Sequence, residues 1–381
     1  MSDRQLFAIR AQDPDSSARR GRLELPRGTV RTPVFMPVGT HGAVKTLAAH
    51  EVRDLGAQII LGNTYHLYLR PGVELVSQFG GLHRFMDWSG PLLTDSGGYQ
   101  IFSLASMRKL DDMGVSFQSH LDGSRHDFTP EKIIDIQRGL GSDLVMVLDE
   151  CPPGDASPEA WRAAVERTTA WARRSLLRFS ETEPQYGQPQ YPVCIVQGGT
   201  DSELRRRSAE ELLELNTPVY AVGGLAVGEP KQELFDTLEL LDSILPRDRP
   251  RYLMGVGTPS DLVRSVARGM DMFDCVMPTR NARNGQLFTP GGTINIRNAQ
   301  YRDDPAPVQE DCDCQLCSRF SRAYLRHLFN TGEVLGLRLA TIHNLKFYLG
   351  LMAAIRAALD AGRFAPWSHD FLQRYEAAGH D

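Results

Sequence analysis

Short apolar segments recur along the chain between residues 34 and 278, and each one ends in glycine or a polar residue. The segments are apolar throughout rather than alternating, which is typical of strands buried on both faces of a parallel sheet. There are eight of them: VFMPVG (34–39), QIILGN (58–63), PLLTDSGG (91–98), DLVMVLDE (143–150), PVCIVQGG (192–199), PVYAVGG (218–224), YLMGVG (252–257) and MFDCVMP (272–278). We therefore predict eight buried strands.

Amphipathic patterns with a helical period lie between several of these segments. The first begins at Ser157, which we expect to cap the helix, and others cover residues 201–215, 230–245 and 258–270. Eight strands alternating with helices over residues 34–278 favour an α/β fold of the (β/α)8 class, a TIM barrel. A doubly wound open sheet is the alternative, and it predicts fewer strands.

The barrel pattern stops near residue 278, and the rest of the chain has a different composition. Residues 277–302 contain four arginines and no acidic residue, whereas residues 303–317 are acidic and rich in cysteine. Two helical patterns follow, at 318–329 and 341–362. The second is apolar on more than one face, so we expect it to pack against the barrel.

Composition narrows the possible functions. Among 381 residues, 42 Lys and Arg against 47 Asp and Glu give a formal charge of −5, which excludes a globally basic nucleic-acid-binding coat but not a local basic groove. No apolar run approaches the ~18 residues of a membrane helix. The opening residues lack an apolar signal core, so we expect a cytoplasmic protein without a membrane segment.

Three of the six cysteines fall within six residues, and a histidine follows after a longer interval. Together they form a Cys3His set suited to tetrahedral Zn²⁺: Cys312, Cys314, Cys317 and His343. We expect the cysteines in a turn and His343 near the start of a helix, which the metal would join. Four protein ligands leave no open position, so we predict one structural zinc in a subdomain at 278–345, within a single barrel domain covering 1–381. Unrelated free cysteines are the disfavoured alternative; Cys194 and Cys275 fit small core residues.

Four acidic residues stand at or near the ends of the predicted strands: Asp95, Asp149, Glu150 and Asp274. Any one alone is better explained as a helix cap or an ion-pair partner. As a set in one barrel mouth they favour glycosidic chemistry, with one carboxylate as nucleophile and another as acid/base. Asp274 directly precedes the acid-free arginine stretch, which points to a reaction on the sugar of a polynucleotide. No P-loop or GxGxxG motif indicates a nucleotide triphosphate or a dinucleotide cofactor.

With these residues in place, the chain resembles the bacterial tRNA-guanine transglycosylases (queuine tRNA-ribosyltransferases) over nearly its whole length. The resemblance rests on the Cys3His set and on FMPVGT, LGNTYHLYLRPG, LTDSGGYQIFSL, LDECPP, IVQGG, YAVGGLAVGE, MGVGTP and FDCVMPTRNARNG. It implies a TIM barrel with a zinc-bearing insertion. It also implies a pentosyltransferase of queuosine biosynthesis that exchanges guanine at anticodon position 34 of GUN tRNAs (Asp, Asn, His, Tyr) for the 7-deazaguanine base preQ1.

The resemblance assigns roles residue by residue. Asp274 matches the nucleophile that attacks C1′ of the ribose and forms a covalent ribosyl-enzyme, and Asp95 matches the general acid/base. Asp149 matches the residue that accepts from N1–H and the 2-amino group of guanine, a donor pair that adenine lacks. The other base-binding residues it implies are Gln197 and the Gly224 N–H as donors to O6, Tyr99 and Met254 as a sandwich around the ring, and Ser96 and Cys151 as pocket lining.

Further matches concern the size of the base and the partners. The Leu225 carbonyl would accept from the aminomethyl group of preQ1, with Glu229 holding that peptide unit. Val227 stands where related eukaryotic catalytic subunits carry glycine, and a valine favours preQ1 over the larger base queuine. Arg280 and Arg283 match contacts to the anticodon loop, although a solvated loop is their alternative explanation.

A stripe of three ring-bearing residues suggests self-association: Phe320, Tyr324 and His327, at i, i+4 and i+7. Such a stripe usually packs in a core. Homodimers of the family bury an aromatic cluster here, with Phe85 joining from the second subunit, so we expect a homodimer.

Two other function classes stay open. A hydrolase of small glycosides would share the two carboxylates but would leave the arginine stretch and Asp149 unexplained. A non-catalytic tRNA-binding subunit would be expected to lack parts of the active set, whereas Asp95, Asp149 and Asp274 are all present.

Overall fold

The centre of the molecule is a parallel sheet that closes into a barrel. A computed structural model describes residues 5–104 and 107–377. The sheet has the order β4-β15-β14-β13-β12-β11-β7-β6-β5, with every neighbouring pair parallel. Its two ends, β4 (Val34–Met36) and β5 (Val38–Gly39), are separated only by Pro37. They are parts of one strand, so the sheet closes with eight strands, and the (β/α)8 prediction is confirmed over the open sheet.

All eight predicted apolar segments contain a barrel strand. The remaining strands are β6 (Ile60–Gly62), β7 (Leu92–Thr94), β11 (Leu144–Met146), β12 (Tyr191–Val196), β13 (Val219–Val222), β14 (Arg251–Leu253) and β15 (Met272–Asp274). The strands are short and mostly buried, as expected where side chains fill the barrel on one face and meet helices on the other.

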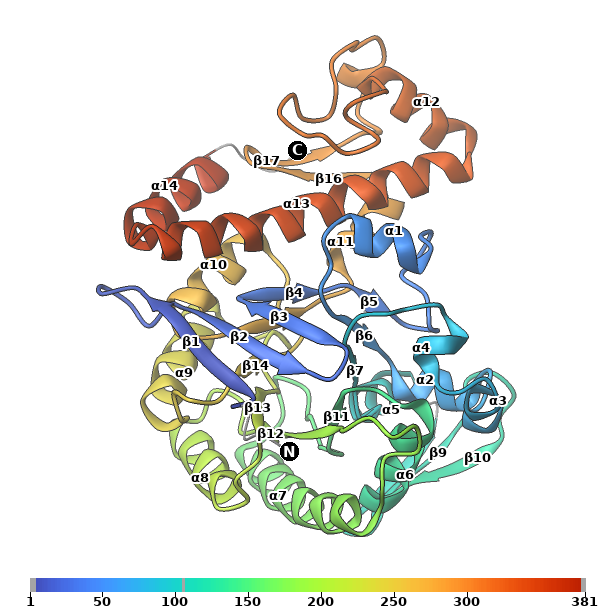
Figure 1. Ribbon diagram of the computed structural model, residues 1–381, viewed down its shortest axis with the longest axis vertical. Helices are drawn as coiled ribbons and strands as arrows, with labels where there is room; N and C mark the ends of the chain where they lie inside the picture. Colours follow the sequence, from blue (N-terminus) through green and yellow to red (C-terminus); the bar gives the residue numbers. More distant parts are fainter. Residues whose placement is uncertain (1–4, 105–106, 378–381) are drawn as a thin grey trace.

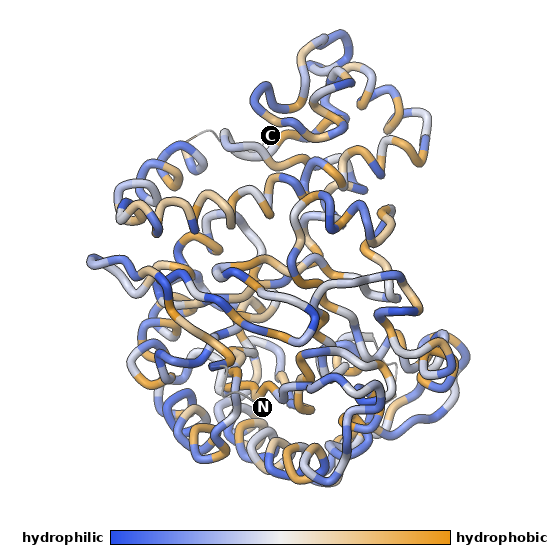
Figure 2. Tube along the Cα trace, in the orientation of Figure 1, coloured by the Kyte–Doolittle hydropathy of each residue, from blue (hydrophilic) through white to orange (hydrophobic). Residues whose placement is uncertain are grey.

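Helices surround the barrel, with hydrophobic and hydrophilic residues alternating along them (Figure 2). The four predicted helices are confirmed as α7 (Pro158–Glu181), α8 (Ser202–Leu213), α9 (Lys231–Ile244) and α10 (Pro259–Ala267). Ser157 caps α7, its Oγ accepting from the N–H of Ala160 at 3.3 Å. The earlier helices are α1 (Ala49–Asp54), α2 (Thr64–Leu69), α3 (Val73–Gln78), α4 (Leu82–Phe85), α5 (Gly98–Leu104) and α6 (Pro130–Leu140).

Two small antiparallel sheets accompany the barrel, and neither is predicted from the sequence. The first joins β1 (Phe7–Gln12), β2 (Arg19–Leu25) and β3 (Gly28–Thr32), which lie across the barrel in Figure 1. Its side chains share one core cluster with residues of the barrel interior such as Val34 and Val219, so this sheet closes one end of the barrel. The second joins β8 (Arg108–Asp111), β9 (Gly114–Gln118) and β10 (Arg125–Phe128).

The carboxyl-terminal part carries a hairpin, four α-helices and a short 3-10 helix. Its elements are α11 (Met277–Arg283), β16 (Gln286–Thr289), β17 (Gly292–Asn295), the 3-10 helix η1 (Ala299–Tyr301), α12 (Arg322–Thr331), α13 (Val334–Asp360) and α14 (Phe364–Ala377). In Figure 1, α13 separates the barrel from β16, β17 and α12. The Tyr348 hydroxyl of α13 donates to the Gly257 carbonyl at 2.6 Å, which confirms that this helix packs on the barrel.

Three sequence-based expectations need correction here. The helix predicted from residue 318 begins only at Arg322, because the preceding residues complete the turn that carries the cysteines. The helix predicted from residue 341 begins at Val334, so His343 lies in the interior of α13 rather than near its start. Cys194 is fully buried as predicted, whereas Cys275 is only partly buried: it packs against the core and also lines a cavity.

Across the residues described, none of the helices combines the length and the apolar character that crossing a membrane requires. Residues 1–4, which belong to the opening segment without an apolar signal core, lie outside the described residues.

Candidate functional site

A central cavity of about 400 Å³ lies where the barrel strands end. Eleven of the residues to which the sequence assigns catalysis or base binding line it: Asp95, Ser96, Tyr99, Asp149, Cys151, Gln197, Gly224, Leu225, Val227, Met254 and Asp274. They come from the ends of six different strands and the loops after them, the position where TIM barrels hold their active sites. Tyr99 is 57% exposed, so its ring lies at the rim of the cavity.

Asp274, the last residue of β15, is held by two donors. The Tyr252 hydroxyl donates to Oδ1 at 2.5 Å, and the Gly255 N–H donates to the same oxygen at 3.0 Å. Burial raises the pKa of Asp274, while these hydrogen bonds oppose the shift. Because both bonds end on Oδ1, Oδ2 is the oxygen that faces away from these donors.

Asp95 follows β7 and is fixed from the neighbouring strand end. Asn63 Nδ2 donates to Oδ2 at 2.5 Å, and the Thr64 N–H donates to Oδ1 at 2.8 Å. Burial, with a smaller contribution from the charge of Asp274, raises the pKa of Asp95 to about 6. A carboxyl group with a pKa near neutrality can both give and take a proton, as a general acid/base must.

Asp149 lies after β11 with both oxygens occupied. Ser96 Oγ donates to Oδ1 at 3.0 Å, and Gln197 Nε2 donates to Oδ2 at 2.7 Å. Burial raises the pKa of Asp149 to about 6. Gln197 Oε1 is buried and has no hydrogen-bond partner among the described residues. The amide nitrogen that the resemblance aims at the base therefore spends one of its two N–H groups on Asp149, and the other N–H is the one left for a ligand.

The loop after β13 forms another wall of the cavity. The Glu229 carboxylate accepts from the Ala226 N–H and, at 2.9 Å, from the Val227 N–H. The Ala226 N–H belongs to the peptide unit whose carbonyl is that of Leu225, so Glu229 fixes the direction of this carbonyl. Glu229 itself does not line the central cavity. Gly224 has φ +63°, and a Cβ there would lie 2.3 Å from Gln197 Oε1, so only glycine fits.

Arg205 of α8 supports this wall and is absent from the sequence-based site. It is fully buried and donates to the carbonyls of Val196, Gly199 and Gly223 at 2.7 Å each and of Gly224 at 3.2 Å. The guanidinium thus ties the end of β12 to the end of β13. Burial lowers its pKa to about 9. Its signal in the sequence is an arginine beside apolar Leu204, on the helix face that meets the barrel.

Two further residues of the cavity also go unassigned by the sequence. Tyr252 is one, because its apolar context suggests only a strand residue. His66 of α2 is the other, with its ring centroid 4.7 Å from that of His41 and 5.8 Å from that of His120. Burial and these neighbours lower the pKa of His66 to about 4, so this imidazole is neutral at pH 7.

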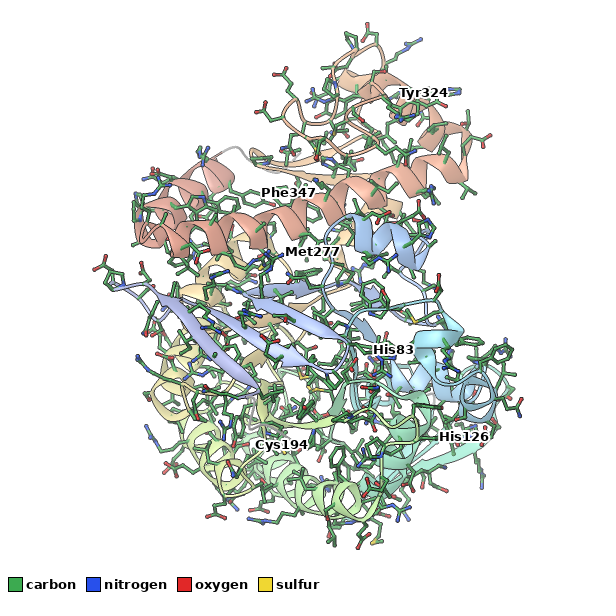
Figure 3. The ribbon with its side chains drawn as sticks, in the orientation of Figure 1. His83, His126, Cys194, Met277, Tyr324 and Phe347 are labelled. Carbon is green, nitrogen blue, oxygen red and sulfur yellow. The ribbon has the colours of Figure 1, made fainter. Side chains whose placement is uncertain are left out.

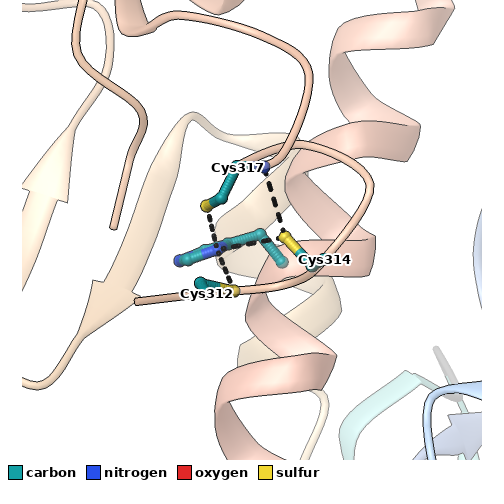
Figure 4. A group of neighbouring side chains, drawn as sticks. Cys312, Cys314 and Cys317 are labelled. Atoms are coloured by element: carbon teal, nitrogen blue, oxygen red, sulfur yellow. Dashed lines mark hydrogen bonds between the residues drawn. The ribbon is translucent and has the colours of Figure 1, made fainter. Parts of the chain in front are cut away.

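The predicted metal ligands gather in one place (Figure 4). The ligand atoms of the three cysteines and His343 all lie within 4.8 Å of one another. His343 Nδ1 is 3.3 Å from Cys317 Sγ, while Nε2 lies 2.8 Å from the Phe288 carbonyl of β16. A backbone acceptor on Nε2 leaves Nδ1 as the ligand atom, the arrangement that zinc-bound histidines use. The donor set and its geometry therefore fit a structural Zn²⁺.

Arg280 and Arg283 lie on α11, directly after the strand that ends in Asp274. Arg280 is exposed, and Arg283 is half-buried. No carboxylate of the described residues forms an ion pair with either one. The two arginines therefore form a small cationic surface. Burial and the charge of Arg280 lower the pKa of Arg283.

The predicted aromatic stripe is partly assembled. Phe320 stacks on Tyr324 with centroids 5.2 Å apart, and Tyr324 is 6.4 Å from His327. Tyr324 is 38% exposed and lies on α12, away from the barrel (Figure 3). Phe85, which is expected to join from a second subunit, lies on α4 and contacts Phe79 of its own chain.

Comparison with known proteins gives a consistent result. A family model described as Queuine tRNA-ribosyltransferase matches residues 13–377. A queuine tRNA-ribosyltransferase of Pelotomaculum thermopropionicum is 54% identical over 371 residues, covering 97% of this chain and 98% of the relative. Proteins of the same name from Symbiobacterium thermophilum (54% identical, 96% and 90% covered) and Herpetosiphon aurantiacus (52% identical, 98% and 94% covered) are similar to the chain as well.

Proposed function

The chain belongs to the queuine tRNA-ribosyltransferase family, and from this premise we propose that it exchanges guanine at position 34 of GUN tRNAs for preQ1 through a covalent ribosyl-aspartate. The observation that carries the proposal is the central cavity, where three buried carboxylates have different donors. Asp274 has one oxygen, Oδ2, that faces away from its two donors. Asp95 has a pKa of about 6, and Asp149 accepts hydrogen bonds from two neutral donors.

The reaction consists of two displacements at C1′ of the ribose. Asp274 attacks C1′ as the bond to guanine breaks, and the departing base takes a proton from Asp95. The incoming base then returns a proton to Asp95 while its ring nitrogen displaces the Asp274 carboxylate. Two inversions restore the configuration, and no external energy source is consumed.

Recognition of the base falls to Asp149. A carboxylate accepts from both N1–H and the 2-amino group of a guanine-type ring, whereas a base without that donor pair leaves a buried charge unpaired, a penalty on the order of 10⁴ in specificity. Gln197 donates its second amide N–H to O6, and the Gly224 N–H adds another donor. The Leu225 carbonyl accepts a hydrogen bond from the aminomethyl group of preQ1. The Val227 side chain limits the size of this substituent and so excludes a base as large as queuine.

The remaining parts of the proposal concern partners and organisation. Arg280 and Arg283 hold phosphates of the anticodon loop, since no carboxylate of the described residues neutralises them. One structural zinc joins the cysteine turn to α13 in a subdomain at 278–345 of a single barrel domain. The exposed Tyr324 supports a homodimer through the aromatic stripe. The cytoplasmic location stays a prediction.

The test is incorporation of labelled guanine into unmodified tyrosine tRNA, with unlabelled preQ1 as competitor. We expect incorporation that preQ1 blocks. Release of free base without incorporation would favour a glycoside hydrolase instead. Retained tRNA and zinc with no exchange would favour a non-catalytic subunit.

A further inference from the structure

A second cavity of about 560 Å³ lies beside the central one, between the loops that follow β11, β12 and β13. We call it the side cavity; its rim includes Asp155, Ala156, Thr200, Asp201 and Glu233. Several of these rim residues are exposed, so solvent reaches it. None of the catalytic carboxylates lines it, and the proposed reaction leaves it without a role.

Only a thin wall separates the two cavities. Gly224 and Val227 line both of them. Gly224 has no side chain, so the half-buried Val227 is the residue of this shared wall that contributes a side chain. The loop that carries it includes Ala226 at φ +58° and Gly228 at φ +123°, a conformation held by the Glu229 carboxylate.

The position in the barrel sets the side cavity apart from the RNA. Asp274 ends β15, and α11 with its two arginines follows directly. In the sheet order, β15 neighbours β4, whereas β11 lies opposite it across the ring and β12 is three strands away. An RNA attached through its ribose to Asp274 and held by Arg280 and Arg283 therefore covers the β15 side of the mouth.

Charge supports the same separation. The lining of the side cavity contains no lysine or arginine. It contains four carboxylates, those of Asp155, Asp201, Glu229 and Glu233. Such a surface repels RNA phosphates. It attracts the aminomethyl group of preQ1, which is a primary amine and carries a positive charge at pH 7.

We propose that the side cavity is the route by which free bases leave and enter the central cavity while the RNA stays attached to Asp274. The inference rests on the proposed function, because two displacements require guanine to depart and preQ1 to arrive between them. Val227 is then both the limit on base size and the partition that a base must pass.

The test fills the side cavity with Thr200→Trp or Ala156→Trp and compares each with Ser202→Trp, an exposed neighbour that does not line it. In the plugged variants we expect steady-state exchange at saturating tRNA to slow at least about tenfold, because base release becomes limiting. The covalent RNA adduct should still form in the first turnover. Binding of preQ1 to the RNA-free protein, whose mouth is open, should stay within about twofold.

Steady-state exchange unchanged in both plugged variants would overturn the passage. Loss of the adduct itself in Thr200→Trp but not in Ser202→Trp would overturn it too, since the blocked step would then be chemistry. A wild-type protein that exchanges no base would instead refute the proposed function.

A charge variant tests the same route without added bulk. Glu233→Gln should lower kcat/KM for cationic preQ1 by about two- to threefold and leave neutral guanine unaffected. Asp236→Asn, on the same helix but outside the cavity, should change neither. An equal effect of Glu233→Gln on both bases, or none on either, would contradict the attraction of preQ1 by the rim.

Discussion

The behaviour of each carboxylate in the central cavity depends on the donors around it. Tyr252→Phe removes the 2.5 Å hydrogen bond to Asp274 Oδ1 from a buried group. Losing a charge-assisted bond of ~1.5–3 kcal/mol raises the pKa of Asp274 further. Because the nucleophile must be ionised, the acidic limb of adduct formation should move to higher pH, while the rate at high pH persists.

Single-turnover adduct formation between pH 5 and 9 measures this shift. Tyr220→Phe, a buried tyrosine of β13 without a contact to Asp274, is the control and should leave the limb in place. An acidic limb that does not move in Tyr252→Phe would show that another group sets it.

The pKa of Asp149 makes a second prediction about pH. Burial raises this pKa to about 6, and only the ionised form accepts from both base donors. Guanine affinity should therefore be constant above pH 7 and fall about tenfold per unit below pH 6. Calorimetric titration of guanine into Asp149→Asn should give weak binding without this slope. Asp95→Asn should keep the slope; its disappearance there would assign the titration to Asp95.

Residues at strand ends were predictable, whereas their mutual contacts were not. Asp95, Asp149 and Asp274 follow apolar segments, and a barrel brings all such ends to one mouth. Tyr252 reaches Asp274 only because β14 and β15 are neighbours in register, with Tyr252 opposite Met272. Nothing local in the sequence encodes that contact. The bond of Gln197 to Asp149 is likewise a property of the folded cavity.

The packing of α13 against α12 can be tested by substituting two glycines of α13. A Cβ at Gly336 would lie 2.9 Å from Leu328 Cβ of α12, whereas a Cβ at Gly350 meets nothing within 4 Å. Gly336→Ala should lower the free energy of unfolding by about 1–3 kcal/mol through overpacking. Gly350→Ala should raise it by about 0.5–1 kcal/mol, because glycine weakens a helix interior. Urea unfolding compares them, and equal effects would mean that α12 moves freely.

The zinc site connects a turn, a hairpin and a helix. Cys317→Ala removes one of four ligands, so bound zinc should fall from one per chain to near zero, and residues 278–345 should become sensitive to protease. Metal analysis checks this against Cys151→Ser, a cavity cysteine distant from the cluster. Full zinc content in Cys317→Ala would refute the ligand set.

Strands were predictable from the sequence where both of their faces are buried. The barrel strands are buried on both faces and stand out as apolar runs, but β8 and β10 read RKLD and RHDF and are largely exposed. Such strands have no hydrophobic period, so pairing with β9 alone defines them. The start of α13 was missed because Gly336 interrupts its apolar pattern, although this glycine allows α12 to approach closely.

At the scale of the whole molecule, charge is divided rather than uniform. The chain carries a formal charge of −5, yet α11 presents two arginines without carboxylate partners in the described part of the chain, and the rim of the side cavity is acidic. We therefore expect RNA to bind on the α11 side of the barrel mouth and to be repelled on the side of the side cavity. Its affinity for RNA should fall as the salt concentration rises despite the negative total charge, because contacts between cations and phosphates supply the attraction.

Substitution of single arginines measures this division. Arg280→Ala should weaken tRNA binding and reduce the slope of log K against log salt by about one, the value for one phosphate contact. Arg206→Ala removes the same charge from α8, on the side of the barrel that carries the side cavity, where Arg206 pairs with Glu210. It should leave both affinity and slope nearly unchanged. Equal losses in the two variants would mean that RNA covers the β12 side as well, and the bases would then need another way out.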